Sequence, residues 1–235
     1  MCGRYLLDMP GATVAQLLQA LDRTDNALPT WNAAPSQLLP VLGWNPDTRE
    51  RSLVKMEWGL VPQWAADAAH ASGGASSQRL KPQINARGES VAERPMFRTA
   101  FSKRRCLIPM RGWYEWVRGP QRKHPWVLQP VVGEDDVATA AGLWERWRSE
   151  DGTPHDTFAI ITCEAAPQIH HLHSRQPVLI GAADRQRWLE TPPGEAVTLH
   201  GLLQAGEPAI DAWEVDTAVN AVSNNSPEVI RPIDA

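Results

Sequence analysis

Residues 105–116 read RCLIPMRGWYEW, a strand-like stretch dominated by apolar and aromatic side chains. Segments of the same character are LLPVLGW (38–44), RSLVKMEWGLVP (51–62), PWVLQPVV (125–132), VATAAGLWERW (137–147) and TFAIITCEA (157–165). The intervening NPDTRE and RSEDGTPHD stretches, the second with an Asp-Gly pair, predict turns. Many strands with closely spaced turns and few helices favour an α+β fold with a mainly antiparallel, barrel-like β core.

Helical patterns are short and lie between these strands. In GATVAQLLQALD, one helical face would carry Val14, Leu17, Leu18 and Leu21. Further expected elements are helices at QWAADAAHA (63–71) and DRQRWLE (184–190), a flexible loop at SGGASSQRLKP (72–82), a last strand at AWEVDTAV (212–219) and a polar tail, SNNSPEVIRPI (223–233). No repeat divides the chain, so we expect a single domain over residues 1–235.

Composition narrows the class of protein. The chain has 235 residues and three cysteines at unrelated spacings, which argues against a disulfide framework and for a reducing compartment. It has no secretory signal pattern and no apolar run that could span a bilayer. We therefore expect a soluble, cytoplasmic monomer, associated with the nucleoid when bound to DNA, with no metal, no cofactor and no membrane partner.

The charge pattern is uneven. A net charge of −4 counts mildly against a general nucleic-acid binder. The run FRTAFSKRRCL nevertheless holds Arg98, Lys103, Arg104 and Arg105 without an acid, which is either a solvated surface or a local basic patch. Eleven tryptophans stand against two tyrosines and three phenylalanines; most should anchor the core, and exposed ones could stack on bases.

Cys2 follows the initiator methionine, and it is small enough for Met1 to be removed. The new terminus would carry an α-amine, with a pKa of ~7.7–8.0, beside a thiol. Such an amine can condense with an aldehyde to an imine, which the thiol closes to a thiazolidine ring. The alternative is a retained Met1 and a cysteine without a chemical role.

Three other sites carry candidate chemistry. Glu115, between aromatics in GWYEWV, could exchange protons near neutrality if buried, or face water on an edge strand. His173 in HHLHSRQP could act as a general acid or belong to a surface histidine cluster; no zinc pattern is present. Asn85 and Arg87 in INARGES would project to one face of an extended segment and suit a sugar-phosphate.

Six segments in order carry a more specific signal. They are MCGRY (1–5), WNAAPSQ (31–37), WGLVPQW (58–64), INARGES (84–90), FRTAFSKRRCLIPMRGWYEW (97–116) and HSRQPVLI (173–180). With them the chain resembles the SOS response-associated peptidase (SRAP) family, the abasic-site processing proteins, from Cys2 to about Pro232. Two departures are Gln176, where the family usually has methionine, and Gly88, where it often has alanine.

The resemblance implies a DNA damage response protein that crosslinks to abasic sites in single-stranded DNA through a thiazolidine at Cys2. Carried over by position, Asn85 would hold the terminal residue and the sugar remnant, Glu115 would handle protons on the α-amine, and His173 would assist ring opening. The expected DNA-binding residues are Arg4, Arg87, Arg175 and Trp116. His170 and His171 have no counterpart. Strand scission as a lyase side reaction and self-removal of Met1 are the accessory activities implied.

Two other functions remain open from the residues alone. One is a cysteine peptidase or N-terminal-nucleophile hydrolase, with Cys2 as acyl acceptor and His173 as its base. The other is a non-covalent reader of single-stranded DNA in which tryptophans stack on bases and Cys2 is idle.

Overall fold

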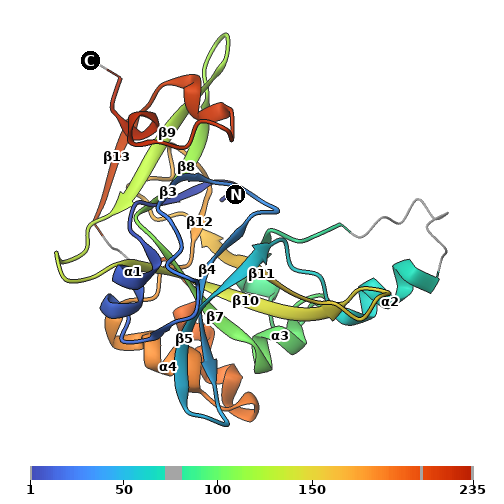
Figure 1. The fold of residues 1–235 in the computed structure, drawn as a ribbon. Coiled ribbons are helices and arrows are strands. Elements are labelled where there is room, and N and C mark those ends of the chain that lie inside the picture. Colours follow the sequence, from blue (N-terminus) through green and yellow to red (C-terminus); the bar gives the residue numbers. More distant parts are fainter. Residues whose placement is uncertain (1, 72–80, 207–208, 234–235) are drawn as a thin grey trace.

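The computed structural model describes residues 2–71, 81–206 and 209–233, and it contains two β-sheets with short helices around them (Figure 1). Most of the loop expected at 72–82 lies outside the described residues. The α+β class and the barrel-like core predicted from the strand pattern are both confirmed.

The strands are β1 (Tyr5–Leu7), β2 (Leu21–Asp22), β3 (Thr30–Ala33), β4 (Leu38–Asn45), β5 (Glu50–Trp58), β6 (Asn85–Arg87), β7 (Arg105–Met110), β8 (Gly112–Arg118), β9 (Lys123–Pro130), β10 (Ala138–Arg148), β11 (Pro154–Glu164), β12 (Arg175–Pro177) and β13 (Ile210–Glu214). The α-helices are α1 (Gly11–Leu17), α2 (Gln63–Ala71), α3 (Arg98–Lys103) and α4 (Arg185–Glu190). Short 3₁₀ helices are η1 (Gly88–Ser90), η2 (Ala182–Asp184), η3 (Pro193–Leu202), η4 (Thr217–Asn220) and η5 (Pro227–Ile230).

Five strands of the larger sheet close into a barrel. Strands β11, β10, β7, β4 and β5 follow one another as antiparallel neighbours. A parallel pairing of β11 with β5, at Thr157 with Glu57 and Phe158 with Trp58, then joins the two ends. Inside, Trp58 stacks on Phe158 with ring centroids 6.1 Å apart. The predicted strands that became β4, β5, β10 and β11 thus form most of the barrel wall. Both predicted turns join the strands expected.

The smaller sheet has the order β13-β9-β8-β1-β3 and packs between two apolar clusters. Trp113 of β8 is fully buried in the main core, whereas Tyr114 belongs to the second cluster with Leu6 and Val127. Successive side chains of a strand point to opposite faces. Residues 105–116 therefore serve both sheets: the chain leaves the barrel with β7 and enters the second sheet with β8 after the single residue Arg111.

Helix α1 is shorter than its pattern predicted. Val14 and Leu18 are buried as expected, but the helix ends at Leu17, and Leu21 lies in β2 with 48% of its surface exposed. Gln19 adopts a left-handed φ of 52°, and the Ala20 N–H donates to the Ala15 carbonyl. This geometry is a Schellman termination, which usually uses glycine. Including Leu21 in the helical face was therefore wrong.

The remaining helices cover the barrel. Trp188 of α4 is fully buried, and its Nε1 donates to the Cys106 carbonyl at 2.8 Å. Helices α2 and α4 occupy the segments predicted for them. The last strand predicted at 212–219 is wrong over its second half, because β13 ends at Glu214 and residues 217–219 lie in the 3₁₀ helix η4. Within the described residues, no helix is long and apolar enough to cross a membrane.

The junction between the sheets depends on Gly112. A Cβ built on Gly112 would lie 2.6 Å from the backbone oxygen of Leu128, which the neighbouring strand fixes in place. We expect Gly112→Ala to lower the free energy of unfolding by about 1–3 kcal/mol, the usual cost of overpacking. Chemical denaturation measures this. Gly133→Ala is the control, because nothing lies within 4 Å of a Cβ there; equal stability of the two variants would contradict the argument.

Candidate functional site

Strand β11 collects the candidate residues of the chain's middle. On one side it pairs with β6 in parallel, with Ile160 opposite Asn85 and Thr162 opposite Arg87. It also pairs antiparallel with β12, with Glu164 opposite Arg175. Segments that lie some 75 residues apart along the chain are in this way held at the same stretch of one strand.

Asn85 contacts the N-terminal segment directly. Its Nδ2 donates to the carbonyl oxygen of Cys2 at 2.7 Å. Among the described residues, its buried Oδ1 has no hydrogen-bond partner. An amide with one bond to Cys2 and one unused acceptor can hold that residue and still bind a hydroxyl.

Glu115 is buried, with 4% of its surface exposed, and does not face water. It lies on β8 opposite Trp126, on the face of the sheet that carries Trp113. Burial raises the pKa of the Glu115 carboxyl to about 7. A carboxyl with such a pKa can give up or accept a proton near neutral pH.

His173 lies beside that carboxyl. Its Nε2 is 3.8 Å from Oε2 of Glu115. His173 Nδ1 is 2.9 Å from the backbone nitrogen of Arg175 and 3.1 Å from the Arg175 carbonyl oxygen, so it accepts from the first or donates to the second according to the tautomer, while Nε2 faces Glu115. Burial lowers the pKa of His173 below its usual 6.5. The imidazolium form, when it occurs, is therefore a stronger acid than a solvent-exposed one.

Cys2 has no surface exposure and lies within the main core cluster. Burial, with the negative charge of Glu115 adding to it, raises the pKa of the Cys2 thiol well above the ordinary value. Its Sγ lies 3.8 Å from the Arg4 carbonyl oxygen. Glu115 is close enough to Cys2 to act on its thiol electrostatically. Together with the Asn85–Cys2 hydrogen bond and the His173–Glu115 contact, this shows that the four candidate residues lie side by side.

Arg4 and Trp116 form a second group, next to the first. The Arg4 guanidinium carbon is 5.6 Å from the centre of the Trp116 ring. Arg4 Nη1 donates to Asn32 Oδ1 at 2.6 Å, and Trp116 Nε1 donates to Asn220 Oδ1 at 2.7 Å. Both predicted DNA-binding residues are thus held in place by asparagines that sequence reasoning did not identify.

Asn32 is the centre of a hydrogen-bond cluster. It is 1% exposed, and its Nδ2 lies 2.8–3.1 Å from the carbonyl oxygens of Val219, Ala221 and Asn224. The Asn225 side chain accepts from the Asn32 backbone N–H at 3.0 Å. The polar tail therefore folds over β3, and the WNAAPSQ segment contributes the residue that receives it.

Arg87 and Arg94 line a cavity with Asn85. The cavity has a volume of about 430 Å³, and its wall includes Ile84 and Phe97. Both arginines are exposed. Because Asn85 also binds Cys2, this cationic cavity adjoins the N-terminal residue, and the predicted shared direction of Asn85 and Arg87 agrees with it.

Arg175 has a different environment. Its guanidinium makes a bidentate ion pair with Glu89, at 2.6 and 2.9 Å, and donates to the Thr162 carbonyl at 2.6 Å. The hydrogen bond from Arg175 lowers the pKa of the Glu89 carboxyl and so favours its ionised form. A phosphate would have to displace Glu89 in order to bind Arg175. The structure therefore supports a DNA contact of Arg175 less than contacts of Arg4 and Arg87.

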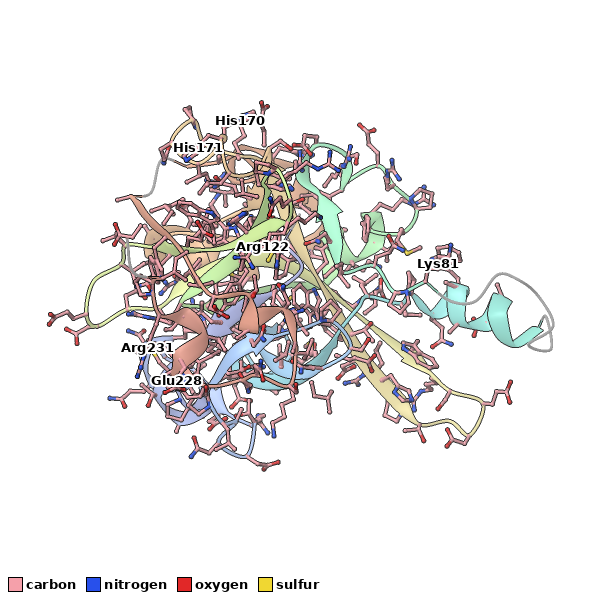
Figure 2. The ribbon with its side chains drawn as sticks, turned by 90° about the horizontal axis from the view of Figure 1, so that it is seen from above. Lys81, Arg122, His170, His171, Glu228 and Arg231 are labelled. Carbon is pink, nitrogen blue, oxygen red and sulfur yellow. The ribbon has the colours of Figure 1, made fainter. Side chains whose placement is uncertain are left out.

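The other basic and histidine-rich features have separate places. Arg105 is buried and donates to four backbone carbonyls, including that of Trp188, while Arg104 pairs with Glu145 at 2.6 Å. The basic run is therefore partly structural. His170 and His171 are exposed, and Figure 2 shows both at the edge of the molecule. In the described ranges, no group of three or more His, Cys, Asp or Glu could hold a metal ion.

The structure shows the surroundings of Gly88 and Gln176, the two positions at which the sequence departs from the family pattern. A Cβ on Gly88 would approach the Leu203 backbone oxygen to 3.1 Å, which accounts for glycine there. Gln176 is fully buried, and its Oε1 accepts from the Ala166 N–H at 2.9 Å. Trp64, 54% exposed on α2, is an aromatic surface that we did not single out from the sequence.

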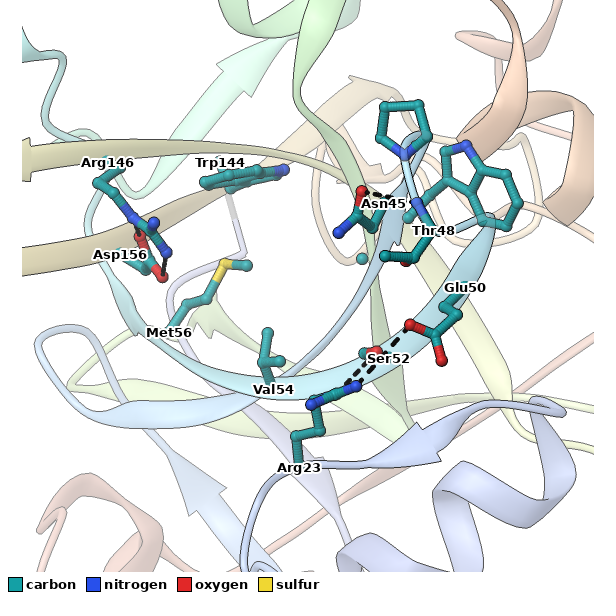
Figure 3. A pocket seen from close by; sticks show the side chains of 13 residues that line it. Arg23, Asn45, Thr48, Glu50, Ser52, Val54, Met56, Trp144, Arg146 and Asp156 are labelled. Carbon is teal, nitrogen blue, oxygen red and sulfur yellow. Dashed lines mark hydrogen bonds and ion pairs between the residues drawn. The ribbon is translucent and has the colours of Figure 1, made fainter.

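A larger cavity, of about 540 Å³, opens at the mouth of the barrel (Figure 3). Val54, Met56 and Trp144 line its apolar part, with Arg23 and the Arg146–Asp156 ion pair at its rim. It contains none of the predicted site residues. The larger of these two cavities is therefore not the one that contains the predicted site residues.

Known proteins resemble this chain in sequence and in fold. A family model described as SOS response associated peptidase (SRAP) matches residues 1–222. The abasic site processing protein YoqW of Bacillus subtilis is 33% identical over 206 residues, 86% of each chain. The abasic site processing protein HMCES of Gallus gallus is 27% identical over 100% of this chain and 78% of its own. A crystal structure of a protein from Bacteroides thetaiotaomicron has the same fold, with a TM-score of 0.81 at 20% identity, covering 99% and 100% of the two chains.

The Asn32 cluster gives a stability prediction. Asn32→Ala removes four hydrogen bonds of a buried side chain, one from Arg4 and three to the carbonyls of Val219, Ala221 and Asn224, so we expect a loss of about 2–3 kcal/mol in the free energy of unfolding. Asn220→Ala removes one hydrogen bond at an exposed side chain and should cost about 1 kcal/mol or less. Urea denaturation of both variants measures the difference, and equal losses would remove Asn32 from the centre of the cluster.

Proposed function

The chain belongs to the SOS response associated peptidase (SRAP) family, and we propose that it processes abasic sites in single-stranded DNA by forming a covalent thiazolidine crosslink through Cys2. The observation that carries this proposal is the hydrogen bond from Asn85 to the Cys2 carbonyl, beside the Glu115–His173 pair. It fixes the terminal residue among groups suited to proton transfer. The names of the relatives YoqW and HMCES support the choice of substrate.

The reaction needs no oxidant or reductant. Protonation of the sugar ring oxygen and loss of the hydroxyl proton open the closed abasic sugar to an aldehyde. The free α-amine of Cys2, exposed by removal of Met1, adds to the aldehyde carbon and expels water, giving an imine. The thiol then adds to the same carbon, and its proton passes to the nitrogen. The imine can alternatively undergo β-elimination with strand scission, which ring closure prevents.

The residues divide this work. His173, with Nε2 toward the pocket, donates the proton to the ring oxygen. Glu115, whose raised pKa lies near neutrality, accepts a proton from the α-ammonium and makes it nucleophilic. Asn85 orients the terminal residue and offers its unused Oδ1 to a sugar hydroxyl.

The state of the Cys2 thiol favours this chemistry over peptide hydrolysis. A cysteine nucleophile that attacks first is activated by a lowered pKa. Here burial raises the pKa of the Cys2 thiol. In thiazolidine formation the amine attacks first and the thiol closes a ring from the next carbon, so proximity replaces activation. A peptidase with Cys2 as acyl acceptor is therefore the weaker candidate.

DNA binding rests on a local cationic surface, because the whole chain carries a net charge of −4. Arg87 and Arg94 stand around the cavity that holds Asn85. Arg4, stacked on Trp116, extends this surface. The expected contacts are to phosphates, which gives affinity that falls with salt.

The central test uses Cys2 variants. With abasic single-stranded DNA, we expect the wild type to form an adduct that survives heating in a denaturing gel and Cys2→Ala to form none. Cys2→Ser should also fail, since an oxazolidine is less stable than a thiazolidine. Intact-mass analysis confirms that each protein has lost Met1. An undiminished stable adduct of Cys2→Ala without reductant would refute the thiazolidine, and peptide cleavage without adduct would favour the peptidase.

His173→Ala should slow crosslinking more than tenfold while the dissociation constant changes little, since general acid catalysis contributes ~10²–10⁴-fold. The lowered pKa of His173 means that its acid form increases as pH falls toward and below 6.5. The ratio of wild-type to variant rate should therefore grow from pH 8 to pH 6. Single-turnover gel kinetics at each pH measure the ratio.

His170→Ala is the matched control, an exposed histidine three positions earlier that should crosslink at the wild-type rate. DNA carrying an aldehyde that needs no ring opening should restore the rate of His173→Ala. Equal wild-type and variant rates on abasic DNA would exclude His173 from the mechanism, and failure of the open aldehyde to restore the rate would assign it a structural role.

A further inference from the structure

The tip of the β8–β9 hairpin is a cationic surface outside the site described above. Arg118 ends β8, Lys123 begins β9, and Arg122 lies in the turn, which the Gly119 N–H closes by donating to the Arg122 carbonyl at 2.9 Å. All three side chains are exposed. The hairpin projects beyond the body of the molecule (Figure 1), and Figure 2, seen from above, labels Arg122.

The arrangement of these charges is unfavourable by itself. Arg118 and Lys123 are direct cross-strand partners, and like charges in that position destabilise a hairpin. Within the described part of the chain, none of the three cations has an ion pair with a carboxylate. The neighbouring Glu214 is engaged by His124 at 2.6 Å. Among the described residues no carboxylate offsets these three exposed charges, so all three can pair with an anion from outside the chain.

The hairpin continues the strand that carries the site. Arg118 is three residues beyond Glu115, or about 10 Å along a strand. Because side chains alternate, Arg118 and Lys123 share the face of Trp116 rather than that of Glu115. Arg4, Trp116, Arg118 and Lys123 then form a row of three cations and one aromatic ring, the combination that follows the backbone of a single strand and stacks on its bases.

We propose that the hairpin tip formed by Arg118, Arg122 and Lys123 binds backbone phosphates of the single-stranded DNA that flanks the lesion, a few nucleotides from it. This rests on the proposed function, since it assigns a path to the same substrate. DNA phosphates can supply negative charge at the cross-strand pair, and the row of side chains runs to the tip from Arg4, two residues after Cys2 in the chain.

The test compares two variants of equal charge change. Arg122→Gln/Lys123→Gln removes two cations from the tip, and Arg49→Gln/Lys55→Gln removes two exposed cations from the β4–β5 hairpin, whose turn lies at the opposite end of the molecule (Figure 1). Binding of a long single-stranded oligonucleotide is measured across a range of salt. Each lost phosphate contact reduces the slope of log affinity against log salt by about 0.7, so the tip variant should lose about 1.4 and the control nothing.

A short oligonucleotide, limited to one nucleotide on each side of the lesion, should give the tip variant and the wild type the same slope. Thermal unfolding without DNA should show no loss of stability in the tip variant, because a repulsive pair has been removed. An unchanged slope of the tip variant on long DNA, or an equal decrease in both variants, would overturn the proposal.

The slopes are measured on undamaged as well as abasic strands. If the wild type formed no adduct with abasic DNA, the thiazolidine function would fail while the tip could still be judged from the undamaged strand. If the tip variant crosslinked a short abasic strand normally but bound long DNA with an unchanged salt slope, only the proposed phosphate binding at the tip would be refuted.

Discussion

The pairing of β11 with β6 is the contact on which the site depends. Three parallel rungs, from Ile160–Asn85 to Thr162–Arg87, fix the direction of the Asn85 amide. The same strand closes the barrel against β5 and receives β12 on its way to the end of the barrel. This buried strand thus sets the position of an amide on β6 and of an imidazole in the segment before β12. Precision at the pocket comes from the barrel and not from the loops that supply the side chains.

The pocket combines groups whose environments shift them toward neutral forms. Burial favours the protonated carboxyl of Glu115, the neutral ring of His173 and the neutral thiol of Cys2. Of these groups Glu115, with a pKa of about 7, can exchange a proton near neutral pH at a small free-energy cost. The charged side chains lie at its margin, where Arg87 and Arg94 remain in solvent.

Local patterns predicted the elements, and long-range contacts escaped them. Strands β4, β5, β10 and β11 were visible because apolar runs bounded by turn residues suffice to identify them. The end of α1 was not, because Gln19 takes the left-handed position in which glycine is the usual signal. The Arg175–Glu89 ion pair joins residues 86 positions apart, and no local pattern in either segment predicts it. Glu115 could be named from the sequence, but its burial follows from β9 and the core packed against it.

The closure of the polar tail over Asn32 has a consequence for the order of events during synthesis. Strand β1 lies between β3 and β8, and its Arg4 is bound to Asn32 and to the Val219 carbonyl. The ribosome supplies these tail residues last, some 190 to 215 positions after the residues they contact. Until then the first strand lacks its final partners, and the start of the chain stays open to processing enzymes for most of translation. The segment that carries Cys2 therefore gains these contacts only after the residues from Val219 onward have been synthesised.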